Sequence, residues 1–81
     1  MRVTIRLFGR LHDLAGASVL EREIPAPATA SGVWQILAAE TPGIAPYAQS
    51  VSVAVNADFA RMATKLEEGD EVAFLPPVSG G

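Results

Sequence analysis

The C-terminal ending Pro76-Pro77-Val78-Ser79-Gly80-Gly81 holds the residue types whose spacing best suits chemistry. The prolines cannot donate the hydrogen bonds of a sheet ladder, and they keep a chain extended. The two glycines lack a Cβ, so they fit a channel too narrow for a side chain. They also leave the terminal carboxylate of Gly81 unhindered, as an adenylating enzyme requires if that carboxylate is to attack ATP. We therefore interpret residues 76–81 as a flexible tail that presents one reactive carboxylate.

A second feature is an apolar patch expected at the root of this tail. Phe8 lies on the otherwise polar face of the first predicted strand, and Leu75 lies opposite the better core candidates of the last one. If these two strands are neighbours, Phe8 and Leu75 share an outer surface, and Phe59 joins them there. Such a patch exceeds what a monomer needs and indicates a docking site. The alternative is that the segment GRLHDLAG covers Phe8, and the pattern alone leaves both open.

Other kinds of chemistry find little support in the residue types. The sequence has no cysteine, which excludes disulfides, thiolate metal sites and a cysteine nucleophile. The single histidine, His12, cannot make a zinc site alone, and we expect no bound metal. The carboxylates at positions 67, 68, 70 and 71 indicate a solvated turn. No Ser-His-carboxylate set is visible, so we expect the chain to have no catalytic activity of its own.

The composition is typical of one small globular domain. The chain has 81 residues, of which 49% are hydrophobic and 19% charged, which is too apolar for a disordered protein. Its net charge of −3 and its scattered basic residues argue against nucleic-acid binding. No apolar run approaches the roughly 18 residues of a membrane span, and the N-terminus lacks the apolar segment of a signal peptide. We therefore expect a cytoplasmic protein with no nucleic-acid or membrane partner.

The periodicity of the apolar residues predicts the elements that carry these features. Alternation predicts strands over residues 3–8, 18–24, 51–56 and 71–75, with a short strand at 59–61. Spacings of three and four predict the main helix over residues 30–41, with Thr29 or Ser31 as its N-cap. A single helical turn is expected to end at Gly16. Residues 43–50 are expected to form a loop or a short turn.

This order of elements indicates an α+β domain of two layers. One helix and a mixed sheet can bury their apolar faces in so short a chain only if the helix packs across one face of the sheet. The order fits a β-grasp, or ubiquitin-like, fold. We therefore predict a β-grasp domain over residues 1–75, followed by the flexible Gly-Gly tail over residues 76–81.

At this point the sequence resembles a known family. The ending GDEVAFLPPVSGG, residues 69–81, closely resembles that of the small sulfur-carrier subunits of molybdopterin synthase, the MoaD type of the MoaD/ThiS ubiquitin-like family. The opening VTIRLFGRLHDLAG, residues 3–16, resembles the start of that family, and AVN at 54–56 fits its middle. A bare Gly-Gly end is weak on its own. The turn, strand, Pro-Pro and Gly-Gly together are specific, and the resemblance covers essentially the whole chain.

The resemblance implies a mechanism. An adenylyltransferase of the ubiquitin-activating type uses ATP to adenylate Gly81, and a sulfurtransferase converts the adenylate to a thiocarboxylate. The tail then enters the large catalytic subunit of molybdopterin synthase and gives sulfur to cyclic pyranopterin monophosphate. Members of this type form a heterotetramer of two small and two large subunits. Phe8, Phe59 and Leu75 fall where the family's docking surface lies. The chain would be a cosubstrate that binds no cofactor, with ATP used by its partner.

Other functions remain open at this stage. The same fold and ending serve carriers of thiamin synthesis, cysteine biosynthesis and tRNA thiolation, although the Pro-Pro-Val-Ser favours the molybdopterin type. A covalent protein modifier like ubiquitin would use the same activation and end as an isopeptide. The single lysine, Lys65, limits self-linked chains but leaves conjugation to other proteins possible. A third class is a plain β-grasp binding module whose tail is idle.

Overall fold

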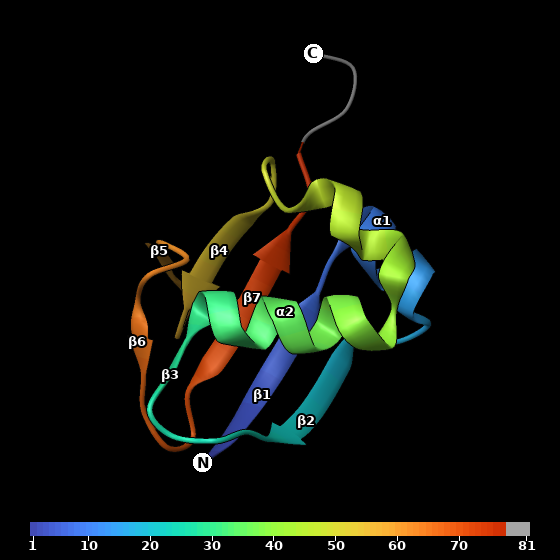
Figure 1. Cartoon of the computed structure of the whole chain (residues 1–81). Helices are drawn as coiled ribbons and strands as arrows, with labels where there is room; N and C mark the ends of the chain where they lie inside the picture. Colours follow the sequence, from blue (N-terminus) through green and yellow to red (C-terminus); the bar gives the residue numbers. More distant parts are fainter. Residues whose placement is uncertain (78–81) are drawn as a thin grey trace.

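The structure is built on a five-stranded mixed sheet with one long helix across its face (Figure 1). It is a computed structural model, and it describes residues 1–77. The strand order is β2-β1-β7-β4-β5; β1 pairs in parallel with β7, and the other neighbours pair antiparallel. The elements in chain order are β1 (Arg2–Leu7), α1 (Gly9–Ala15), β2 (Val19–Glu23), β3 (Ala28–Thr29), α2 (Ala30–Glu40), the 3₁₀ helix η1 (Pro42–Tyr47), β4 (Ser52–Val55), β5 (Asp58–Ala60), β6 (Lys65–Leu66) and β7 (Glu71–Leu75).

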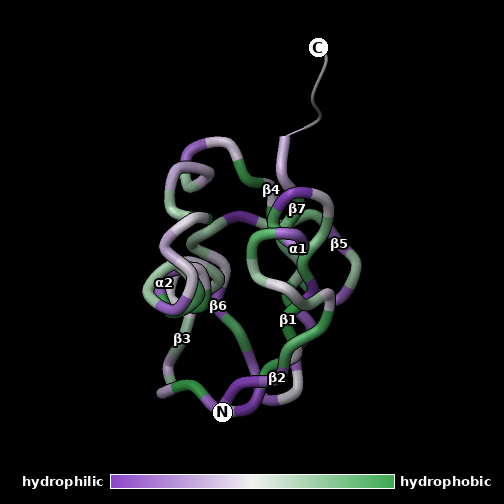
Figure 2. The backbone as a smooth tube through the Cα atoms, turned by 90° about the vertical axis from the view of Figure 1, so that its right-hand side faces the viewer, coloured by the Kyte–Doolittle hydropathy of each residue, from purple (hydrophilic) through white to green (hydrophobic). Residues whose placement is uncertain are grey.

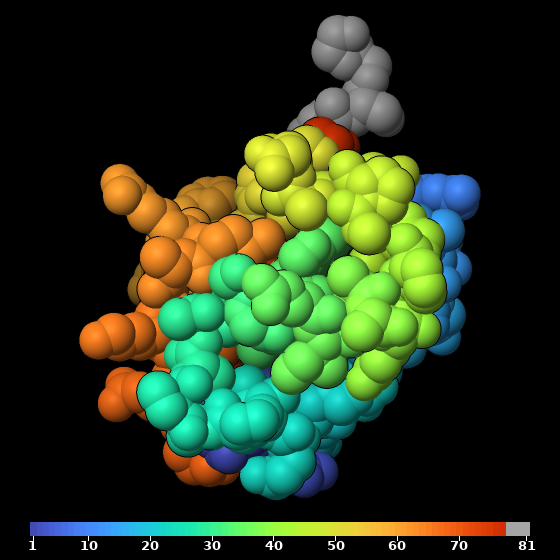
Figure 3. Space-filling view, viewed as in Figure 1, coloured from blue at the N-terminus to red at the C-terminus, as the bar shows by residue number. Residues whose placement is uncertain are grey.

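The core lies between α2 and one face of this sheet. The strands β1 and β7 alternate, so Ile5, Leu7 and Phe74 point into the core and are buried. From α2, Trp34 is buried against Phe74, with the two ring centroids 5.1 Å apart. Figure 2 shows the two layers from the side, and in Figure 3 α2 and η1 cover the sheet face that is turned to the viewer. The predicted α+β architecture with a mixed sheet and one main helix is confirmed.

The start of α2 is fixed by three kinds of hydrogen bond. The side chain of Thr29 is the N-cap, and its Oγ1 accepts from the backbone amide of Gly32 at 3.2 Å. The amides of Ala30 and Ser31 have no partner within the helix, and they donate to the carbonyls of Thr64 and Met62. The short ladder between β3 and β6 holds these two segments side by side. Of the two predicted N-caps, Thr29 and Ser31, the structure uses Thr29. The helix ends at Glu40, one residue before the predicted end.

The segment after α2 differs from the sequence-based expectation. Residues 43–50 were expected to form a loop or short turn, whereas η1 makes a 3₁₀ helix over Pro42–Tyr47. Ile44 is buried in the core and anchors this helix, which contacts both α1 and α2. The pattern missed it because Pro46 and Gly43 are typical helix breakers, and one buried side chain gives no periodicity. Short 3₁₀ turns tolerate both residues.

The short helix α1 follows the expectation closely. Its C-cap is Gly16 in the left-handed conformation, with φ of 75°, and the Gly16 amide donates to the carbonyl of His12 at 2.9 Å. His12 is exposed and lies 3.3 Å from Asp13, away from the sheet faces. No helix within residues 1–77 has the length and apolar character needed to cross a bilayer. In the same residues, no group of three or more His, Cys, Asp or Glu side chains is arranged as metal ligands.

Candidate functional site

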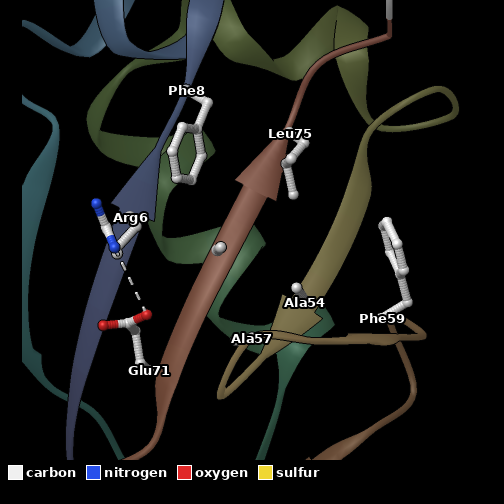
Figure 4. Close-up of a pocket in the computed structure, with 8 residues that line it drawn as sticks. Arg6, Phe8, Ala54, Ala57, Phe59, Glu71 and Leu75 are labelled. Atoms are coloured by element: carbon white, nitrogen blue, oxygen red, sulfur yellow. Dashed lines mark ion pairs between the residues drawn. The ribbon is translucent and has the colours of Figure 1, made fainter.

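The outer face of the sheet, opposite α2, carries a shallow apolar groove of about 230 Å³. The three middle strands β1, β7 and β4 supply its floor and one wall, and the β4–β5 hairpin supplies the other wall (Figure 4). It is lined by Arg6, Phe8, Ala54, Ala57, Phe59, Glu71, Ala73 and Leu75. Each strand alternates, so the residues next to the core side chains in sequence point to this outer face.

The floor is low because two alanines meet there. Ala54 of β4 and Ala73 of β7 are register partners in the antiparallel ladder. Phe8 and Leu75 rise on one side of this pair, and Phe59 rises on the other (Figure 4). A pair of small side chains between larger ones makes a concave apolar surface that a protruding side chain of another molecule can fill.

The walls expose an unusual amount of aromatic surface. Phe59 has 86% of its surface exposed, and Phe8 has 38%. Phe59 is the register partner of Ala54, whose small side chain cannot cover the aromatic ring. The alternative in which the α1 segment covers Phe8 is therefore not what the structure adopts. Exposed aromatic rings of this kind, gathered on one face, are typical of protein–protein contact sites.

A pair of opposite charges borders the groove at its end away from the tail. The guanidinium of Arg6 lies 5.4 Å from the ring centroid of Phe8, within range of a cation–π contact. Its Nη1 lies 3.9 Å from Oε1 of Glu71, the dashed contact in Figure 4. Both side chains are exposed, so this ion pair contributes at most about 1 kcal/mol. Its position beside Phe8 makes it a polar rim for an otherwise apolar surface.

The hairpin that carries Phe59 is held by hydrogen bonds from the start of β7. Asn56 and Ala57 have positive φ angles of 51° and 72°, as expected for Asn but unusual for Ala. The Asn56 side chain accepts from the Glu71 amide at 3.0 Å and donates to the Asp70 carboxylate at 3.0 Å. Asp70 also accepts from the Glu67 amide at 2.8 Å. The carboxylates expected to be only solvated therefore include one that organises two turns.

The root of the tail lies beside the same face. After Leu75, residues Pro76 and Pro77 line a second hollow of about 460 Å³ together with Gly9, Arg10 and Tyr47. The chain leaves β7 at the end of the sheet where α1 and η1 lie (Figure 1). The predicted residues Val78, Ser79, Gly80 and Gly81 lie outside the described residues.

The structure thus brings Phe8, Phe59 and Leu75 to one surface and places Pro76 and Pro77 at its edge. Sequence reasoning missed the alanine floor, because it follows from the register of β4 against β7 rather than from residue type. It also missed Arg6 and Glu71. The alternation that singled out Phe8 and Leu75 places both of these charges on the same outer face, so the signal for them was present.

Comparison with known proteins identifies relatives along the full length of the chain. The sequence profile of the ThiS family matches residues 5–81. The curated molybdopterin synthase sulfur carrier subunit of Mycobacterium tuberculosis is 30% identical over 82 residues, covering 100% of this chain and 99% of that protein. The resemblance stated from the sequence is therefore confirmed.

Solved structures of similar fold also match the full length of the chain. The small archaeal modifier protein 1 of Haloferax volcanii has a TM-score of 0.87 at 25% identity, with 100% of both chains covered. A chain from the complex of subunits 1 and 2 of molybdopterin-converting factor from Helicobacter pylori has a TM-score of 0.69 at 26% identity, again over 100% of both chains. The predicted β-grasp fold is thereby confirmed. Profile, relative and fold agree over nearly every residue, and the chain belongs to the ThiS family.

Proposed function

We propose that this protein is the sulfur carrier of molybdopterin synthase, with the carboxylate of Gly81 as its reacting group. One observation carries the proposal most directly: the apolar groove opens on the sheet face whose central strand, β7, leads into the Pro76-Pro77 segment. A partner that binds the groove is thereby placed next to the root of the tail. The name of the Mycobacterium tuberculosis relative supports the same function.

The chemistry proceeds in three steps. A Gly81 carboxylate oxygen attacks the α-phosphorus of ATP in the adenylyltransferase, which releases pyrophosphate and leaves an acyl adenylate. A hydrosulfide equivalent from a sulfurtransferase then displaces AMP, which gives the thiocarboxylate. Its sulfur forms a C–S bond to a side-chain carbon of the cyclic pyranopterin precursor in the large synthase subunit, and the C–O bond of that carbon breaks, so that its oxygen leaves as water or stays on the phosphate. Hydrolysis of the acyl–sulfur bond then leaves the sulfur on the precursor and returns the carboxylate. Two such transfers give the dithiolene.

The groove serves in this scheme as the docking surface for the large subunit. Full burial of a Phe side chain contributes about 1.5–3 kcal/mol, so Phe59 and Phe8 together supply a large share of the binding free energy. The charged rim of Arg6 and Glu71 would contribute orientation more than affinity. The synthase is proposed to contain two carriers and two large subunits. The complex of subunits 1 and 2 from Helicobacter pylori is a precedent for the association of the two kinds of subunit.

Catalysis is assigned to the partners. Among the side chains that line the groove within residues 1–77, the polar ones are Arg6 and Glu71, and they contact each other. Both lie at the end of the groove away from Leu75, so we assign the general base and the oxyanion donors to the partners. The chain therefore acts as a cosubstrate, and its contribution is to present Gly81 in a fixed relation to the docked surface.

Mass spectrometry of the tryptic peptide spanning residues 66–81 tests the proposal. The protein is incubated with an adenylyltransferase of the ubiquitin-activating type, a sulfurtransferase, ATP and a sulfur donor. A sulfur-for-oxygen mass shift localised to Gly81 is expected. The peptide contains no methionine, so oxidation cannot mimic the shift. A variant lacking Gly81 is the control and should stay unmodified while binding the large subunit normally. An unmodified wild-type peptide, with an enzyme shown to be active on another carrier, would refute the proposal.

A covalent protein modifier is the second candidate, favoured by the likeness to the Haloferax volcanii modifier protein. It shares the adenylation step, but the Gly81 acyl group ends on a lysine amine of another protein. The two candidates separate on the product. An isopeptide-linked Gly-Gly remnant on other proteins, without sulfur at Gly81, would favour the modifier. Restoration of molybdopterin formation by the sulfur-loaded carrier would favour the carrier.

A further inference from the structure

The first residue of α1 makes an unusually close approach to the root of the tail. A Cβ placed on Gly9 would lie 2.9 Å from Cγ and 3.7 Å from Cδ of Pro76. Carbon atoms in favourable contact are about 3.5–4.0 Å apart, so even a methyl group at position 9 would overlap the proline ring. The missing side chain of Gly9 is what leaves room for Pro76 where it lies.

Neither Gly9 nor the Pro76 ring can move easily to relieve such an overlap. The proline ring is closed onto its own backbone nitrogen, so it cannot rotate away as a flexible side chain would. The position of Gly9 is fixed by α1, because Leu11, two residues later, is fully buried and its amide donates to the Phe8 carbonyl at 3.1 Å. On the other side, Phe74 anchors the end of β7 in the core with none of its surface exposed. A group added at Gly9 would therefore displace the backbone at Pro76.

We propose that Gly9 is a positioning residue that sets the direction in which the chain leaves β7. Its bare α-carbon lets Pro76 pack against the start of α1, beside Arg10 and Tyr47. The groove for the partner and the root of the tail are thereby held in one fixed relation. This inference rests on the proposed function, since it matters only if the tail must reach a partner's active site after docking. It concerns the rate of the reaction at Gly81 rather than the affinity of docking.

The chain offers a matched control for the test. Gly9 has a positive φ of 54°, so alanine there carries backbone strain as well as the overlap. Gly16 has a φ of 75° and no atom within 4 Å of an added Cβ. Gly16→Ala therefore introduces the strain without the overlap. Pro76→Ala removes the ring that Gly9→Ala would meet, so the double variant keeps the strain and loses the overlap.

The kinetic test uses carriers already loaded as the Gly81 thiocarboxylate. It measures the rate of sulfur transfer to the pyranopterin precursor in the large subunit and the dissociation constant for the same subunit. Gly9→Ala should lower the turnover rate about tenfold, as small misplacements of reacting groups do, with the dissociation constant changed less than about twofold. Gly16→Ala should stay within about twofold of wild type in both quantities. In the Pro76→Ala background, adding Gly9→Ala should change the rate less than about twofold, because a shared contact makes the two changes non-additive.

Three results would overturn the inference. Equal losses from Gly9→Ala with and without Pro76 would mean that backbone strain alone is responsible. A higher dissociation constant of Gly9→Ala for the large subunit would mean that Gly9 acts through the neighbouring Phe8 and the groove. A wild-type protein without a nuclear Overhauser effect between the Gly9 α-protons and the Pro76 ring would lack the contact itself. This last measurement needs no variant, so it tests the Gly9–Pro76 contact even if Gly9→Ala fails to fold.

The same measurements keep the two proposals apart. If wild-type protein never acquires sulfur but the Gly9–Pro76 contact is observed, the sulfur-carrier function is wrong, and a positioning role in sulfur transfer falls with it. If wild-type protein acquires sulfur and transfers it in the large subunit, and loaded Gly9→Ala transfers it equally fast, the function stands and the positioning role is refuted.

Discussion

Ala54 and Ala73 are register partners on β4 and β7, and together they form the floor of the shallow apolar groove on the outer sheet face. These two small side chains leave a low floor between Phe8 and Leu75 on one side and Phe59 on the other. A flat outer face would result if either alanine were large. The concavity is therefore a property of the register, and it can be removed without touching the core.

Ala73→Leu should fill the groove and weaken docking. The new side chain would occupy the depression between Leu75 and Phe59, and a partner side chain could no longer enter it. We expect the dissociation constant for the large subunit to rise about tenfold or more, equivalent to about 1.4 kcal/mol. Calorimetric titration measures this, and a leucine on the exposed face should change the melting temperature little. Unaltered affinity would show that the partner does not use the groove.

Phe8→Asp should weaken the same complex through the wall of the groove. A carboxylate at this position would have to be desolvated against an apolar partner surface, which is costly. Phe8 is partly exposed, so the free domain should keep its fold. Val19→Asp is the matched control, because Val19 is 51% exposed and lies on the edge strand β2 outside the groove. Equal effects of the two substitutions on affinity would contradict the assignment.

Ala57→Gly should stabilise the free domain. Ala57 has a φ of 72°, where an L-residue with a Cβ is disfavoured by roughly 1–2 kcal/mol. Glycine relieves that cost and loses part of the gain to its freer unfolded state, which leaves a net increase of about 0.5–1 kcal/mol. Urea denaturation checks the prediction, with Ala48→Gly at a residue with right-handed helical backbone angles as a control that should destabilise. A loss of stability in Ala57→Gly would show that the turn is not strained.

Trp34→Ala should come close to unfolding the domain. The side chain is 5% exposed and packs on Phe74, the largest fully buried residue. Removing a buried aromatic side chain costs about 3–5 kcal/mol, while a domain of this size has a total stability of roughly 4–12 kcal/mol. Gln35→Ala, on the exposed side of α2, should change stability by less than about 0.5 kcal/mol. Comparable denaturation midpoints for the two variants would contradict the packing described.

The sequence could predict the elements of the fold because most of them follow from local patterns. Strand β7 was predicted with its observed bounds, since a strict alternation lies between a Gly-Asp turn and two prolines. The cap at Thr29 and the left-handed Gly16 also follow from residue type. The helix η1 was missed because a single buried Ile44 produces no period. The two-residue ladder of β3 and β6 was missed because it depends on segments far apart in the chain.

The candidate site was predictable only in part, for a related reason. Phe8 and Leu75 are apolar residues on the outward-facing side of their strands, so each can be recognised from the pattern of its own strand. Their proximity depends on the parallel pairing of β1 with β7, which brings Leu7 opposite Phe74. The overlap at Gly9 was beyond sequence reasoning, because it depends on where the chain lies after β7. Pairings between distant segments, rather than residue types, turn these side chains into a surface.

The parallel pairing of β1 with β7 also bears on how the protein is made. The first strand to leave the ribosome has its central partner in the last, so the middle of the sheet stays open until residues 71–75 have been synthesised. A nascent chain that stops earlier lacks the strand between β1 and β4 and leaves Ile5 and Leu7 uncovered. Such a product exposes apolar surface and unpaired strand edges, which chaperones and proteases recognise. A chain that ends before residue 71 therefore lacks the strand that completes the sheet as well as the segment that follows it.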